Sequence, residues 1–83
     1  MNKRDFEQLS LHNKLAKLFE NGEELFLRHS DGFTVKLYQL NDFFCEIWYS
    51  SEANQIYNVQ TVDVKDVASL YKIDLDLDHI INQ

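Results

Sequence analysis

The first part of the chain has apolar residues at the spacing of an amphipathic helix. Between Arg4 and Glu20 the apolar positions recur mostly every three or four residues, at Phe6, Leu9, Leu11, Leu15, Leu18 and Phe19. This spacing places them along one side of a helix, where they are buried together. A glycine just after the last apolar residue is typical of a helix that ends in the left-handed conformation; Gly22 has that place, and Asn21 is the second candidate for it. The pattern predicts one helix over residues 4–20.

After Gly22 the pattern changes to the two-residue alternation of β-strands. Ser30–Gly32 and Asn41–Asp42 have the composition of tight turns, because Gly, Asn and Asp tolerate the backbone angles that such turns need. Asn58 and Gln60 weaken the alternation of the last strand. Four strands are expected over residues 25–29, 33–40, 43–50 and 56–62, with a polar loop at 51–55.

Asp63 begins a second helical pattern. A carboxylate at this place accepts hydrogen bonds from the first helical turn, and the apolar residues that follow have helical spacing, at Val64, Val67, Leu70 and Tyr71. From Ile73 onward the sequence fits either a continued helix or an alternating strand over residues 73–78. We favour a helix with a break near Asp74.

The expected order of elements is α-β-β-β-β-α. Consecutive strands joined by short turns form an antiparallel meander, and helices at its two ends pack most simply on one face of the sheet. The chain has no proline, no low-complexity run and no internal repeat. The sequence therefore predicts an α+β fold made of an N-terminal helix, a four-stranded antiparallel β-meander and a C-terminal helix, in a single domain over residues 1–83.

Length and composition limit the class of protein. A chain of 83 residues buries only a modest core, and its one cysteine excludes an intrachain disulfide, which favours self-association as an added source of stability. The hydrophobic fraction of 45% is that of a folded chain. No apolar run is long enough for a membrane span, and no signal peptide is expected, so we expect a cytoplasmic protein without membrane contact.

The charge is acidic. Fourteen Asp and Glu residues against eight Lys and Arg give a formal net charge of −6. A phosphate backbone is repelled by such a charge, which makes nucleic acid an unlikely partner, whereas a basic protein partner is compatible with it. Solubility alone also accounts for the charge.

No pattern of catalytic, metal-binding or cofactor-binding residues is recognised. Asp74, Asp76 and Asp78 resemble the opening of a calcium loop, but the glycine and the bidentate glutamate that complete such a loop are missing. Cys45 alternates with Phe43, Ile47 and Tyr49 on a strand face that we assign to the core, and the histidines lie on separate elements, at His12, His29 and His79. We expect no enzyme, no metal and no cofactor.

One face of the predicted sheet is unusually aromatic. If Val35 and Leu37 face the helices, their neighbours on the strand face away, together with alternate residues of the next strand. The interaction surface predicted in this way consists of Lys36, Tyr38, Phe44, Glu46 and Trp48. Large exposed aromatic patches mark protein interfaces. The alternatives are that the C-terminal helix covers this face, or that the two faces are exchanged and the first helix packs there.

These observations favour a non-enzymatic protein-interaction module. We expect a homodimer that associates through the sheet face, and an inhibitor, immunity or antitoxin-like role suits an acidic protein with a basic partner. One alternative is a small DNA-binding regulator, because residues 64–81 have the pattern of two helical segments separated by a short break, which is typical of a helix-turn-helix. The other is a small ligand-binding protein with a pocket between a helix and the sheet.

Overall fold

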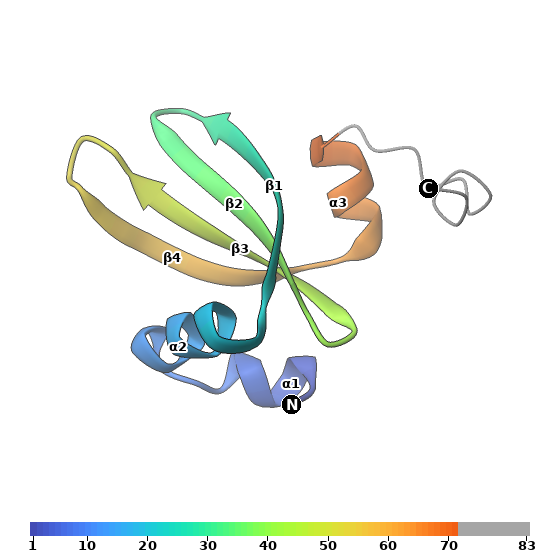
Figure 1. The fold of residues 1–83 in the computed structure, drawn as a ribbon. Helices are drawn as coiled ribbons and strands as arrows, with labels where there is room; N and C mark the ends of the chain where they lie inside the picture. The colour runs from blue at the N-terminus through green and yellow to red at the C-terminus, as the bar shows by residue number, and fades with distance from the viewer. Residues whose placement is uncertain (72–83) are drawn as a thin grey trace.

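Residues 1–71 are described in a computed structural model, and they form three helices and one four-stranded sheet (Figure 1). The strands are β1 (Glu23–Ser30), β2 (Phe33–Leu40), β3 (Phe43–Ser50) and β4 (Gln55–Val62), which pair antiparallel in the order β1-β2-β3-β4. The helices are α1 (Lys3–Glu7), α2 (Leu11–Asn21) and α3 (Val64–Tyr71). The predicted α+β meander with helices at both ends is confirmed. None of these helices is long and apolar enough to cross a membrane.

The N-terminal helical segment is two helices rather than the predicted one. The Asn2 side chain caps α1 by accepting from the Asp5 N–H at 2.8 Å, and the Ser10 hydroxyl caps α2 by accepting from the Asn13 N–H at 3.2 Å. A serine side chain that bonds to the backbone in this way starts a new helix instead of continuing the old one. Because the chain changes direction between the helices, Phe6 of α1 and Leu18 of α2 both become fully buried.

Gly22 ends α2, but in the extended conformation (φ −81°, ψ 156°), so the predicted left-handed cap is wrong. The Gly22 N–H donates to the Leu18 carbonyl at 2.8 Å, and the chain then enters β1 directly. A Cβ at this position would lie 2.6 Å from the Leu18 oxygen, closer than van der Waals contact allows. Glycine is therefore required here by a close backbone approach and not by a positive φ.

Short turns determine which residues are opposite each other in the sheet. Asp31 (φ 48°) and Gly32 (φ 86°) place Ser30 opposite Phe33, and Asn41 (φ 56°) with Asp42 places Leu40 opposite Phe43. Side chains of paired residues point to the same face. The β2–β3 register therefore puts one set of side chains on one face, with Tyr38 opposite Cys45, and another set on the other face, with Leu37 opposite Glu46 and Val35 opposite Trp48.

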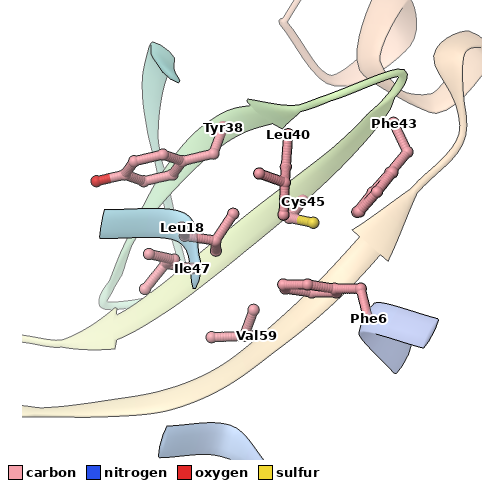
Figure 2. Close-up of a cluster of buried hydrophobic side chains, with 8 residues drawn as sticks. All are labelled: Phe6, Leu18, Tyr38, Leu40, Phe43, Cys45, Ile47 and Val59. Carbon is pink, nitrogen blue, oxygen red and sulfur yellow. The ribbon is translucent and has the colours of Figure 1, made fainter. Parts of the chain in front are cut away.

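The helices lie on opposite faces of the sheet, so the prediction that they share one face is wrong (Figure 1). α1 and α2 pack on the face that carries Cys45, which we call the α2 face. Eight buried residues form the main core there (Figure 2), namely Phe6, Leu18, Tyr38, Leu40, Phe43, Cys45, Ile47 and Val59. α3 packs on the other face, the α3 face, where Val67 is buried and Tyr71 contacts Glu46. This three-layer arrangement was the alternative in which the C-terminal helix covers the aromatic face.

Replacing Gly22 with alanine should lower the free energy of unfolding by about 1–3 kcal/mol, because the added methyl group collides with the Leu18 carbonyl. Asn21→Ala is the matched control, since Asn21 is exposed at the end of the same helix, and it should change stability by less than about 0.5 kcal/mol. Urea unfolding of the two variants measures both values. Equal effects would contradict the steric role of Gly22.

Candidate functional site

The described residues form a hollow on the α2 face. Its volume is about 360 Å³, near the lower end of the range for ligand pockets. It is lined by one α2 residue and by residues of the three strands β2, β3 and β4, namely Phe19, Thr34, Lys36, Tyr38, Ile47, Tyr49 and Ile56. The sheet supplies a rigid floor, and the end of α2 supplies one wall.

The hollow exists because α2 does not cover the whole length of the strands. Leu18 is fully buried in the core, whereas the next residue, Phe19, is 63% exposed and meets the Tyr38 ring edge-on, with centroids 6.5 Å apart. In Figure 2 the Tyr38 ring extends beside Leu18 and Ile47, away from Phe6. The core therefore continues into an open apolar surface on which Phe19 is the most exposed large side chain.

Three of the four polar side chains that line the hollow have partners, namely Lys36, Tyr38 and Tyr49. Glu24 lies beside Tyr38 because β1 contains a bulge between Glu24 and Phe26. Its Oε1 accepts from the Tyr38 hydroxyl at 3.3 Å and pairs with Lys36 Nζ at 3.3 Å. Burial, followed by the charge of Glu24, raises the pKa of Tyr38 above its usual value. The hydroxyl of Tyr49, another residue that lines the hollow, donates to the Asn54 side chain. These contacts leave a mainly apolar surface.

Three glutamates lie at the junction of α2 and β1; Glu24 reaches the hollow, whereas the register pairs Glu23 with Gln39 on the α3 face. Glu20 follows Phe19 in α2, and Glu23 and Glu24 begin β1 just after the helix. Within residues 1–71, Glu24 pairs with Lys36, whereas Glu20 and Glu23 form no ion pair. The carbonyl end of a helix also carries partial negative charge, and α2 has no basic residue in its last turn. The end of α2 therefore carries negative charge that no basic residue of its last turn offsets.

The five residues of the predicted interaction surface do not share a face. Lys36 and Tyr38 lie on the α2 face and line the hollow, whereas Phe44, Glu46 and Trp48 lie on the α3 face. The face assignment was wrong because a two-residue turn that pairs Leu40 with Phe43 pairs even-numbered residues of β2 with odd-numbered residues of β3. Whether any of the five contacts a partner stays a prediction.

Glu46 is the centre of a buried ionic cluster on the α3 face. It is fully buried, and its carboxylate accepts from Arg28 Nε at 3.1 Å, from Arg28 Nη2 at 3.3 Å and from the Tyr71 hydroxyl at 2.7 Å. The Arg28 guanidinium also lies over the rings of Trp48 (5.1 Å) and Tyr71 (5.7 Å). Burial and the hydrogen bond to Glu46 raise the pKa of Tyr71. The cluster ties β1, β3 and α3 together.

The aromatic residues near this cluster pack on one another. The Phe33 ring meets Trp48 edge-on, with centroids 5.5 Å apart, and meets Tyr57 at 5.2 Å with a tilt of 49°. Tilted and edge-on arrangements are those that packed aromatic rings prefer. Among the described residues the indole N–H of Trp48 is buried without a hydrogen-bond partner. The aromatic pattern that predicted an exposed patch thus comes mostly from side chains that stabilise the α3 face.

Cys45 is buried on the α2 face, as predicted, and burial raises the pKa of its thiol to about 12. A thiol with that pKa is a poor nucleophile near neutral pH. In the described part of the chain, no three His, Cys, Asp or Glu side chains gather closely enough to hold a metal ion. His79, the aspartates of the predicted calcium-loop resemblance and the second half of the helix-turn-helix lie outside the described residues.

Sequence analysis named a pocket between a helix and the sheet only as an alternative and did not locate the hollow. Phe19 was assigned to the buried helix stripe because it lies four residues after Leu15, and its exposure depends on where α2 ends relative to the strands. Ile56 and Thr34 appeared only as strand residues. One signal was present in the sequence: Leu18 and Phe19 are consecutive, so the apolar side of the helix is wider at its end than the core requires.

Replacing Arg28 with methionine should lower the free energy of unfolding by about 3–5 kcal/mol, because it leaves the buried Glu46 carboxylate without its cation. The double variant Arg28→Met/Glu46→Met should recover most of that loss, since no buried charge remains. Lys3→Ala, which removes the exposed ion pair with Asp63, is the control and should lower stability far less than Arg28→Met does. A double variant no more stable than Arg28→Met in urea unfolding would contradict this account of the cluster.

Comparison of the chain with protein-family models, with curated proteins and with solved structures gave no match. The functional argument therefore depends on the geometry of the hollow and on the side chains that line it.

Proposed function

We propose that the protein is a non-enzymatic binding module that receives an apolar segment of another protein in the hollow beside α2. The observation that carries this proposal is the exposure of Phe19 at the wall of an apolar hollow. Contiguous apolar surface at a concave site favours association, and aromatic residues are enriched in the centres of protein interfaces.

The chemistry at the hollow supports binding rather than catalysis. Lys36 and Tyr38 both bond to Glu24, and the Tyr49 hydroxyl bonds to Asn54, so neighbouring residues hold three of the four polar side chains that line the hollow. A catalytic site instead presents a nucleophile, or an acid and a base, to the substrate. Cys45 is buried within the core and does not line the hollow.

A protein segment suits the hollow better than a small molecule does. A ligand pocket generally buries about 70–90% of the surface of a small ligand. One wall of this hollow is the exposed ring of Phe19, so the hollow encloses a small ligand less completely. A protein partner covers such a ring with the surrounding part of its own surface. Self-association through a sheet face remains a prediction, and a second copy of this chain is an alternative occupant that the experiment separates.

A phage library of random twelve-residue peptides, selected on the wild-type protein, tests the proposal. Phe19→Asp places a charge at the wall of the hollow, and because Phe19 is exposed the variant should fold normally. We expect selected peptides to carry large apolar residues and to lose binding to Phe19→Asp, but not to Tyr57→Asp, a matched change at an exposed aromatic residue of the other face.

Two results would overturn the proposal. One is a failure to select peptides that distinguish the wild type from Phe19→Asp. The other is a dimer, observed by analytical sedimentation, that Phe19→Asp converts to a monomer, because the occupant of the hollow is then a second copy. Circular dichroism of the variants provides the folding control.

A further inference from the structure

We infer that the outer edge of β1 is a second docking site, at which an extended segment of another protein adds to the sheet as a fifth strand. The segment carries apolar side chains on both of its faces. The site lies outside the hollow, so this inference does not depend on the proposed function. Three observations carry it: the backbone groups of the edge, two exposed apolar side chains on opposite faces, and the lack of features that protect an edge strand.

The outer edge of β1 has backbone groups that no other strand uses. β1 is the last strand on one side of the sheet, and within residues 1–71 no strand pairs with its outer edge (Figure 1). A two-residue turn follows β1, so Ser30 and Phe33, which flank it, form a hydrogen-bonded pair, and such pairs alternate along antiparallel strands. Leu27 and His29 therefore direct their N–H and C=O groups away from β2. In the described part of the chain, no backbone hydrogen bond outside the sheet satisfies these groups.

Two consecutive residues of this edge expose large apolar side chains. Phe26 is 45% exposed and Leu27 is 48% exposed. They point to opposite faces, because Phe26 pairs with Leu37 on the α3 face and Leu27 pairs with Lys36 on the α2 face. A partner that covers one face of the sheet reaches only one of them. A strand added at the edge lies beside both, since its own side chains alternate between the two faces.

This edge lacks the features by which edge strands usually avoid pairing with another chain, which are free charges, prolines and bulges. The bulge of β1 lies before Phe26, so residues 26–30 pair regularly with β2. That segment has no proline, and Arg28 is its one residue among Lys, Arg, Asp and Glu. The Arg28 side chain is 18% exposed and is held by Glu46, so it does not guard the edge. Five consecutive residues are therefore available to a further strand.

The opposite edge of the sheet, β4, is less suitable. A bulge leaves Tyr57, in the first half of β4, without a paired residue in β3. In the second half, the Thr61 hydroxyl donates to the Glu7 carboxylate of α1 at 2.7 Å, which places that helix beside the strand. An uninterrupted segment comparable to residues 26–30 of β1 is therefore not free on this side.

A strand of another protein fits the β1 edge better than a second copy of this chain does. Antiparallel pairing of residues 26–30 with themselves over their full length places the two Arg28 side chains opposite each other, and like charges directly opposite are destabilising. A shift that centres the pairing on Leu27 avoids this contact but sets Leu25, the residue at the bulge, opposite His29. A strand of another protein, uncharged at its centre and without proline, meets neither constraint.

Hydrogen exchange measured by NMR tests the inference with two peptides that differ at one position. Acetyl-KTVFVTE-amide can form a strand, whereas acetyl-KTVPVTE-amide lacks the central N–H. In the free protein the Leu27 and His29 amides should exchange fast, because they form no backbone hydrogen bond. A saturating amount of the first peptide should slow both roughly tenfold, since exchange then requires its release. The proline peptide should have little effect.

Leu27→Lys places a free charge at the edge and should weaken binding of the strand peptide about tenfold. Val64→Lys, the same change at an exposed apolar residue at the start of α3, is the matched control and should bind the peptide as the wild type does. Phe19→Asp should also bind it normally, which separates this site from the hollow. Circular dichroism checks that all three variants fold.

Three results would contradict the inference. The first is slow exchange of the Leu27 and His29 amides in the free monomer, because the chain itself then covers the edge. The second is a dimer in sedimentation whose dilution restores fast exchange, because the occupant is then a second copy. The third is an equal effect of the two peptides, or of the two lysine variants, including no effect of either. Slow exchange with the strand peptide in both wild type and Phe19→Asp supports the inference whatever the phage selection on the hollow gives.

Discussion

The two-residue turn at Asn41 and Asp42 determines which side chains share a face of the sheet, and the rest of the structure depends on it. With Leu40 opposite Phe43, every residue of β2 is matched to one residue of β3. A shift by one residue would move each side chain of β3 to the other face. The positive φ of Asn41, 56°, is well tolerated by asparagine, which lets so short a turn form.

That register gives the sheet two buried faces with different roles. The α2 face carries the aliphatic and aromatic core and continues into the open hollow. On the α3 face, Glu46 lies opposite Leu37 and is fully buried, so it requires both Arg28 and Tyr71 as partners. Burying a charge costs free energy, and a well-aligned ion pair does no more than offset that cost. The cluster therefore serves to fix the position of α3 and does not add net stability.

Much of the fold was predictable, because local chemistry determines it. The alternation of residues 33–40 and 43–50 and the turn residues between them correctly placed β2 and β3, and Gly22 correctly marked the end of α2. Predictions failed where a structure depends on distant groups. Gly22 is extended because the chain enters β1 directly after it, and the exposure of Phe19 follows from the length of α2 relative to the sheet.

The candidate site was less predictable than the fold. Lys36 and Tyr38 were singled out, and both line the hollow, but they had been grouped with residues of the other face. Counting across the Asn41–Asp42 turn would have separated the groups from sequence alone. Locating the hollow requires knowledge of where α2 stops relative to the strands, which neither periodicity nor composition supplies.

The register across β2 and β3 is tested most directly by side-chain NOEs in isotope-labelled protein. The account predicts NOEs from the Tyr38 ring to Cys45 and from the Val35 methyl groups to the Trp48 indole, on opposite faces of the sheet. NOEs from the Tyr38 ring to Trp48 would contradict it, because they would place the two groups on one face.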